Sequence, residues 1–197
     1  MKVVLASRNR HKVVEIAALL QGLDLQLCGI DDVAPGVPLH EDEATFEGNA
    51  LAKARQAAEA TGLPALGDDS GLEVDALEGA PGVWSARYAG LPSDDGRNNA
   101  KLLGALAAVE ARRRTARYRC VAAFVDLAAG KQLTAAGACE GVILEAARGS
   151  GGFGYDPLFF LPQLGKTMAE IDLGEKNQLS HRAAAFRALA AQLRAGR

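Results

Sequence analysis

Short apolar runs alternate with segments of helical periodicity in the first part of the chain, and this alternation constrains the fold more than any other feature. The run at residues 3–6 predicts a buried strand, and a second strand is expected at 25–30. Between them, apolar residues recur at helical spacing, namely Val13, Ile16, Ala17 and Leu20. Thr45 is a suitable N-cap for a further helix to about Thr61. Strands that alternate with helices predict an α/β protein.

The rest of the chain adds a hairpin to this alternation. Strands are expected at 72–77, 117–127 and 132–143, and the last two flank Ala129-Gly130. One helix is expected after a cap at Ser93 or Asp94, with residues 112–114 in its last turn, and another closes the chain from about 179 to 193. The mixture indicates a mixed central sheet flanked by helices. No repeat or linker interrupts residues 1–197, so a single domain is expected.

Composition and charge exclude several classes of protein. The chain is 49% hydrophobic and 23% charged, with a net charge of −2, which is typical of a globular protein without general affinity for nucleic acids or membranes. The sequence contains no apolar run of about 18 residues, which a membrane-spanning helix would need. Three widely spaced cysteines, an odd number, indicate free thiols that fill the core in a reducing compartment, so a cytoplasmic location is expected.

A polar segment, residues 7–12, follows the first predicted strand and precedes the first helix. It offers a hydroxyl, an amide and several cations at the carboxyl end of a strand, where open α/β sheets bind ligands. Together with the free N–H groups of a helix start, these groups suit a phosphate. The alternative is a solvated basic loop.

An acidic pair, Asp68-Asp69, stands next to Ser70-Gly71 after an apolar stretch. Adjacent carboxylates repel, which favours a cation, and hard oxygen ligands suit Mg²⁺. The alternative is an Asx-type turn, since Asp, Ser and Gly are turn residues. The acidic cluster at residues 41–43 supplies either a further ligand or only charge at a helix N-terminus.

Two later segments complete the candidate site. Residues 149–157 contain G-x-G-x-x-G, but Pro157 and an apolar run follow where the dinucleotide fingerprint requires a helix. The glycines around Phe153 instead predict a loop that places the ring against a flat ligand, the alternative being a glycine-rich hairpin with a core Phe. Lys176 with residues 180–182 brings cations to a helix start, where they favour an anionic or carbonyl-rich ligand.

Taken together, these segments resemble the inosine triphosphate pyrophosphatase family, whose members hydrolyse the triphosphates of deaminated purines. The motifs occur in the family's order along almost the whole chain. They are Ser7-x-Asn9-x-x-Lys12, Thr45-Phe46-x-x-Asn49-Ala50-x-x-Lys53-Ala54, Asp68-Asp69-Ser70-Gly71-Leu72, Gly79-Ala80-Pro81-Gly82-x-x-Ser85-Ala86-Arg87-Tyr88, Gly152-Phe153-Gly154-Tyr155-Asp156-Pro157 and Ser180-His181-Arg182.

The resemblance implies an α/β fold of two lobes with a substrate cleft between them, a homodimer, and Mg²⁺-dependent hydrolysis of ITP, dITP or XTP to the monophosphate and pyrophosphate. It makes Asp69 the catalytic carboxylate and a metal ligand, with Glu41 as the second metal ligand. The phosphate-facing positions are Ser7, Asn9, Lys12 and Lys53. The residues that contact or flank the base are Ser70, Phe153, Gly154, Tyr155, Asp156, Lys176, His181 and Arg182.

Recognition of the base follows from hydrogen-bond chemistry. A 6-oxo purine presents an acceptor where adenine presents a donor, and Lys and Arg carry only donors. Two positions depart from the family's pattern, since Arg8 replaces a glycine and His40 replaces an acid. The alternatives are a pyrophosphatase for pyrimidine or methylated nucleotides, a nucleotide sensor without turnover, and a nucleic-acid module built on residues 112–119. The choice of Asp68 or Asp69 as the base stays open.

Overall fold

The computed structural model describes residues 1–195, apart from the side chains at positions 11 and 173. The chain divides into two compact units. Unit 1 comprises Met1–Asp69, Cys120–Gly137 and the C-terminal segment from His181, and unit 2 comprises Ser70–Arg119 and Ala138–Ser180. The prediction of a single domain stays a prediction, as does a cleft between two lobes.

Seven strands form one sheet in the order β2-β1-β3-β4-β5-β6-β7. Strand β1 pairs in parallel with β2 and β3, whereas β6 pairs antiparallel with β5 and β7. The sheet is therefore mixed, and helices flank it, which confirms the predicted fold class. The strands are β1 (Lys2–Leu5), β2 (Gln26–Gly29), β3 (Ala65–Val74), β4 (Thr115–Asp126), β5 (Lys131–Ile143), β6 (Phe159–Leu161) and β7 (Lys166–Thr167).

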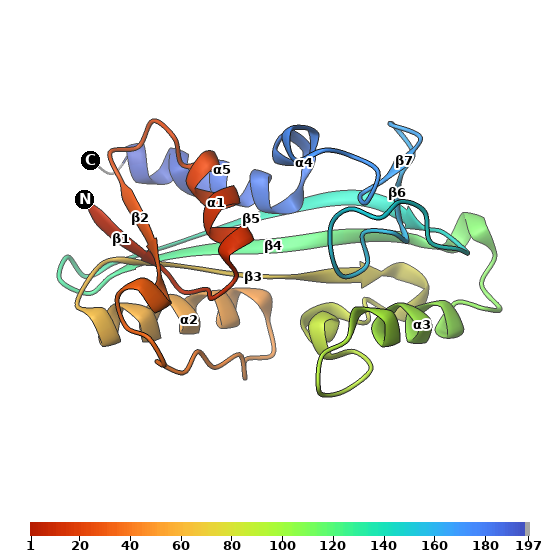
Figure 1. Cartoon of the computed structure of the whole chain (residues 1–197), viewed down its shortest axis with the longest axis horizontal. Coiled ribbons are helices and arrows are strands. Elements are labelled where there is room, and N and C mark those ends of the chain that lie inside the picture. Colours follow the sequence, from red (N-terminus) through yellow and green to blue (C-terminus); the bar gives the residue numbers. More distant parts are fainter. Residues whose placement is uncertain (196–197) are drawn as a thin grey trace. The chain divides into compact units, whose positions relative to one another are not determined.

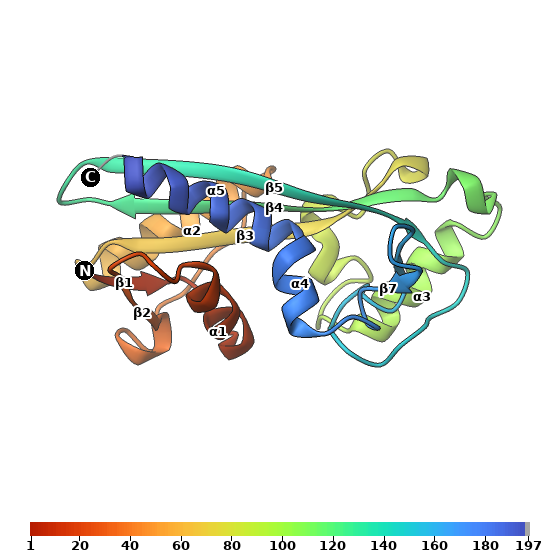
Figure 2. The ribbon, with the colours of Figure 1, turned by 90° about the horizontal axis from the view of Figure 1, so that it is seen from above.

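Unit 1 is layered around its strands. Helices α1 (Arg10–Leu19) and α5 (His181–Ala195) cover one face, and α2 (Phe46–Thr61) covers the other (Figure 1, Figure 2). The core consists of apolar side chains from the strands and from α1 and α5, including Leu5, Ile16, Leu66, Phe124 and Phe186. Burial of this set supplies the main stabilisation of the unit.

Helix α2 begins at the expected cap, where the Thr45 hydroxyl accepts a hydrogen bond from the amide of Gly48 at 3.0 Å. It lies very close to β3, because Gly67 has no side chain. A Cβ atom at Gly67 would stand 2.3 Å from the Ala50 carbonyl oxygen. On β5, a Cβ atom at Gly137 would likewise stand 2.3 Å from the His181 carbonyl oxygen of α5. Glycines thus allow both helices to reach the sheet.

Unit 2 contains α3 (Asp95–Ala105), α4 (Leu173–Leu179), β6 and β7, with short 3₁₀ turns at Asp75–Leu77, Gly82–Arg87 and Ala111–Arg113. Its core includes Leu72, Leu102, Leu106, Leu158 and Phe159. Among residues 1–195, no helix is both long and apolar enough to cross a membrane.

Three predicted boundaries are wrong. The Asp68–Gly71 segment lies inside β3 instead of in a turn, because β3 is a continuous strand that is buried over nearly its whole length. Helix α3 ends at Ala105, so residues 112–114 lie outside it instead of in its last turn. The Arg114 side chain donates to the carbonyls of Leu106 and Val109. The closing helix is two helices, because Ser180 has an extended backbone between them.

Two predictions about burial also need correction. Ala17 is exposed on α1, and Glu15 is buried in its place. The reason is electrostatic, since Glu15 forms an ion pair with a buried arginine of α5. The three cysteines are free, as expected, but only Cys120 and Cys139 are buried; Cys28 is half-buried on the edge strand β2.

Candidate active site

Asp68 and Asp69 occupy adjacent positions of β3, so their side chains point to opposite faces of the sheet. Asp68 faces α1 and α5, and Asp69 faces α2. The pleat therefore reduces the repulsion between the two carboxylates from which a cation was predicted, and Asp69 as a metal ligand stays a prediction. Each carboxylate has its own set of partners in unit 1.

Asp68 lies in a buried ion-pair network. Its carboxylate is 3.0 Å from Lys12 Nζ and 3.4 Å from Arg182 Nε, and Arg182 Nη1 is 2.8 Å from Glu15 Oε2. The residue is only 1% exposed. Burial alone would raise its pKa, but the charges of Lys12, Arg182 and Lys53 outweigh burial and hold the pKa well below the usual value. Asp68 is therefore ionised at neutral pH and anchors two cations.

Asp69 has a different environment on the α2 side. Asn49 Nδ2 donates to Asp69 Oδ2 at 3.0 Å, and Lys53 Nζ is 3.6 Å from Oδ1. Burial is the strongest influence on this carboxyl group and raises its pKa above the usual value, against the opposing effects of Lys53 and Asn49. A raised pKa makes Asp69 the more basic of the two carboxylates, and its catalytic role stays a prediction.

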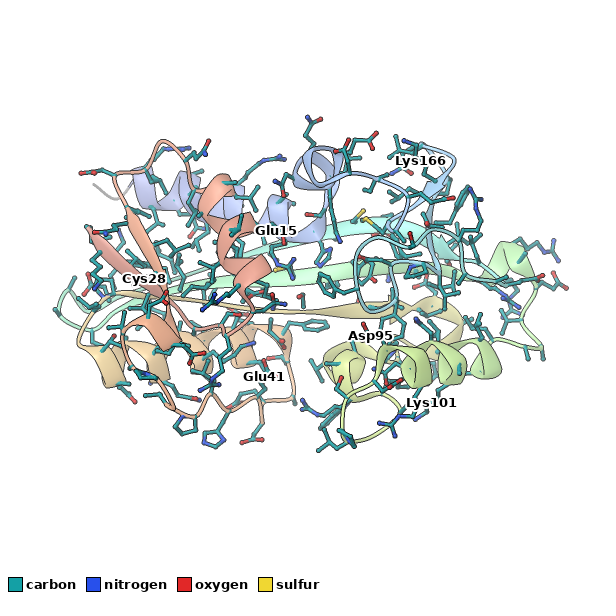
Figure 3. All side chains as sticks on the ribbon, viewed as in Figure 1. Glu15, Cys28, Glu41, Asp95, Lys101 and Lys166 are labelled. Atoms are coloured by element: carbon teal, nitrogen blue, oxygen red, sulfur yellow. The ribbon has the colours of Figure 1, made fainter. Side chains whose placement is uncertain are left out.

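Lys53 joins this group to the loop before α2. Its Nζ forms a very short contact with Glu41 Oε1 in addition to the contact with Asp69. Glu41 projects from the loop that precedes α2 (Figure 3). Burial opposes the charge on Lys53, but Asp68, Asp69 and Glu41 raise its pKa. Lys53 thus stays a cation between the two carboxylates that were predicted to bind metal.

The polar segment after β1 forms the start of α1. The Ser7 hydroxyl accepts from the Asn9 amide at 3.2 Å, and Asn9 Oδ1 accepts from the Lys12 amide at 3.4 Å. Arg8 pairs with Asp31 at 3.3 Å, so its charge is directed to the loop after β2. His40 Nδ1 is 4.0 Å from Asp42, and both side chains are exposed.

The predicted base-contacting residues divide between the units. His181 and Arg182 begin α5 in unit 1, and both are buried. Ser70 lies on β3 at the first position of unit 2, which also contains Lys176 on α4. The loop residues Phe153, Gly154, Tyr155 and Asp156 belong to unit 2.

Within unit 2, Asp156 organises the glycine-rich loop. Its Oδ2 accepts from the Phe153 amide at 3.1 Å and from Lys176 Nζ at 2.7 Å, and its Oδ1 accepts from Tyr118 at 3.1 Å. The Tyr155 hydroxyl donates to the Ser85 carbonyl at 2.8 Å. Phe153, in contrast, is 50% exposed. The loop therefore presents an aromatic ring on a backbone held from within, so the alternative of a core Phe is wrong.

The donor atoms fit a hard divalent cation that also binds phosphate. In residues 1–195, apart from the undescribed side chains, no three His, Cys, Asp or Glu residues gather as metal ligands. Mg²⁺ commonly takes only one or two protein carboxylates and completes its coordination with phosphate and water. The network of unit 1 holds four acidic side chains (Glu15, Glu41, Asp68, Asp69) against three cationic ones (Lys12, Lys53, Arg182). A triphosphate bound there would need further positive charge.

Four residues in these networks were missing from the predicted site. Asn49 stood in a quoted motif, and its capacity to donate to Asp69 was the available clue. Glu15 looked like an ordinary polar position of an amphipathic helix. Asp95 and Asn99 lie on α3, far in sequence from the loop that they contact, so no local pattern identifies them.

Comparison with known proteins gives a consistent result. The chain belongs to the Ham1 family, whose model matches residues 3–192. It is 53% identical over 187 residues to a dITP/XTP pyrophosphatase of Desulforamulus reducens, covering 95% of this chain and 92% of that protein. A dITP/XTP pyrophosphatase of Geobacter sulfurreducens is 52% identical over 185 residues, covering 94% and 92%. The Ham1 protein of Staphylococcus aureus superposes with a TM-score of 0.90 at 37% identity, covering 100% of both chains. The resemblance found in the sequence is confirmed.

Proposed function

We propose that this chain hydrolyses ITP, dITP and XTP to the monophosphate and pyrophosphate, and thereby removes deaminated purines from the nucleotide pool. The observation that carries the proposal is the setting of Asp69, a carboxylate with a raised pKa beside Lys53 and Asn49. The names of the relatives, dITP/XTP pyrophosphatases at about half identity, support the same substrates.

In the proposed reaction, Asp69 accepts a proton from a water molecule as the water oxygen bonds to the α-phosphorus. The bond from the α-phosphorus to the bridging oxygen breaks, and pyrophosphate leaves with the electron pair. Lys12 and Lys53, with Ser7, Asn9 and the start of α1, bind the phosphates and stabilise the developing charge. Asp68 keeps Lys12 and Arg182 in place.

We further propose Mg²⁺ as the cofactor, with Asp69 and Glu41 as its protein ligands. When bound, the ion would neutralise phosphate charge that the nearly balanced side chains of unit 1 leave uncompensated. Lys53 would then contact phosphate in place of Glu41, because the Glu41 carboxylate would hold the ion and the lysine ammonium stands on a flexible stem.

We assign recognition of the purine base to the exposed ring of Phe153 and to several hydrogen-bond donors. Phe153 stacks on the purine, with Ser70 and the loop residues Gly154, Tyr155 and Asp156 around it. Lys176, His181 and Arg182 supply donors toward the 6-oxo group, and an unpaired buried donor against adenine's amino group would cost on the order of 1–3 kcal/mol. This cost favours inosine and xanthosine over adenosine.

The decisive experiment incubates the purified chain and Mg²⁺ with ITP, dITP, XTP, ATP, GTP and dCTP, and separates pyrophosphate from orthophosphate. We expect pyrophosphate mainly from ITP, dITP and XTP, and loss of turnover with EDTA that returns on Mg²⁺ addition. A preference for dCTP would favour the rival pyrimidine enzyme, and binding without turnover would favour a nucleotide sensor. Orthophosphate as the product would overturn the assigned bond.

A nucleic-acid module is the least favoured alternative. Arg117 is 2.9 Å from Asp75 and 3.1 Å from Glu140, Arg112 is 2.7 Å from Glu110, and Arg114 is buried. Paired arginines have little charge left for a phosphate backbone.

We also propose a homodimer in the cytoplasm, as the family resemblance implies. Three free thiols are compatible with a reducing compartment. Light scattering after gel filtration should give twice the chain mass of 20.5 kDa. A monomer mass at micromolar concentration would contradict the dimer.

A further inference from the structure

Two side chains of α3 contact both backbone polar groups of Gly154, the residue that follows Phe153 in the aromatic loop. The Gly154 amide donates to Asp95 Oδ2 at 2.7 Å, and the Gly154 carbonyl accepts from Asn99 Nδ2 at 3.0 Å. Asp95 and Asn99 are four residues apart and therefore lie on one face of the helix. We refer to these two residues as the α3 pair.

We propose that the α3 pair are positioning residues that fix the orientation of Phe153, and so set the affinity for the base. The inference rests on the proposed function, in which Phe153 stacks on a purine. Neither residue belongs to the loop itself, and Asp95 comes from the first turn of α3 (Figure 3).

The exposure of Phe153 makes such positioning necessary. Because half of the residue is exposed, packing against a core does not fix the ring. Its direction depends on the backbone at 152–154, where Gly152 and Gly154 have left-handed φ values of 73° and 62°. Glycines are the least restrained residues, so a loop built on them needs external contacts to hold one conformation.

The loop is restrained from two sides, and the α3 pair is the outer restraint. Asp156 holds the Phe153 amide from within the loop, and Lys176 Nζ lies 5.0 Å from the centre of the Phe153 ring. These contacts restrain the Phe153 amide and one side of the Phe153 ring. The two peptide units that meet at Gly154 follow Phe153. Among the hydrogen bonds of the described residues, only the α3 pair contacts the Gly154 N–H and C=O groups.

The test compares D95A and N99A with wild type in steady-state hydrolysis of ITP. We expect the KM for ITP to rise by about 5- to 10-fold in each variant, as the loss of one hydrogen bond predicts, with kcat within twofold. Inhibition by inorganic tripolyphosphate, which has no base, should be unchanged within twofold. D95N should restore the KM, because an amide oxygen still accepts from the Gly154 amide.

The matched control is D94A. Asp94 is the N-cap of α3 and accepts from the Arg97 amide at 2.7 Å, but it has no contact with Gly154 among the described hydrogen bonds. Its loss weakens the helix in the same turn. If D94A raised the KM as much as D95A, the effect would come from helix stability, and the positioning role would be overturned. An unchanged KM in both D95A and N99A would overturn it as well.

Coupling to the ring supplies a second readout. In an F153A background, D95A should cause no further rise in KM, because the ring that it orients is absent. An additive rise would overturn the proposal.

Hydrogen exchange of the 149–158 segment needs no turnover, and it should become faster in D95A than in D94A. If wild type released no pyrophosphate from ITP, the proposed function would fail. Unchanged exchange in D95A would refute the α3 contact itself.

Discussion

Replacing Asp69 with Asn is expected to lower kcat for ITP by about 10²- to 10⁴-fold, the range that a positioned general base contributes. The amide has almost the same shape as the carboxylate, and its one oxygen can still accept from either Asn49 or Lys53, but it cannot accept a proton from water. The KM should change by only a few-fold, since the phosphate-binding lysines remain. Rapid-quench measurement of pyrophosphate release separates the chemical step from product release.

A suitable control for Asp69→Asn is Glu59→Gln, which removes one carboxylate from the exposed side of the same unit. Its kcat should equal that of wild type. Retention of more than a tenth of the wild-type kcat in the D69N variant would contradict the assignment of Asp69 as the base, and direct binding of ITP would show whether the site is intact.

The pH profile offers an independent check of the same residue. Burial raises the pKa of Asp69 in the metal-free chain, so its ionised form is lost as the pH falls through a value above the usual 3.8. The hydrogen bond from Asn49 lowers this pKa, and Asn49→Ala should therefore move the acidic limb of kcat/KM, which reports the free enzyme, to higher pH. An acidic limb that stays in place would show that another group controls it.

Replacing Asp68 with Asn is expected to destabilise the fold by about 3–5 kcal/mol, as removal of one partner from a buried ion pair does. The substitution removes the carboxylate that pairs with Lys12 and with Arg182. Urea unfolding followed by circular dichroism measures the loss. Glu110→Gln, which removes an exposed ion pair with Arg112, should cost about 0–1 kcal/mol.

The contribution of Asp68 should depend on pH in a definite direction. Its pKa in the folded chain lies below the usual 3.8, so the stabilisation is complete at neutral pH. It is lost as the pH falls below 3.8 and through the folded pKa, because protonation then favours the unfolded chain. The difference between wild type and D68N should therefore shrink in acid. A difference that is constant down to pH 2 would contradict the ion-pair origin.

Local sequence patterns predicted which helices and strands form better than they predicted where each one begins and ends. Helix α2, its end at Thr61 and its Thr45 cap were predicted from capping chemistry, and all are present. The position of Asp68 and Asp69 inside β3 did not follow, because Asp, Ser and Gly favour turns and only pairing with neighbouring strands overrides that preference. The break at Ser180 was hidden by apolar residues that continue the helical spacing on both sides.

The local structure of the site could be predicted where one motif contains the residues, as in the loop that exposes Phe153. It could not be predicted where partners come from distant segments. Glu15 is 167 positions from Arg182, and Asp95 is 59 positions from Gly154. Contacts over such separations depend on the whole topology, which periodicity and composition do not determine.

The alternation of side chains along β3 has a consequence for how this family can vary. Asp68 serves the α1 and α5 face, and Asp69 serves the α2 face. Inserting or deleting one residue upstream in β3 would exchange the two faces, so that the anchor and the base change places while the dipeptide itself is unaltered. The number of residues between the start of β3 and this dipeptide should therefore be kept as strictly as the two acids themselves. Insertions and deletions should be found in the loops that flank β3.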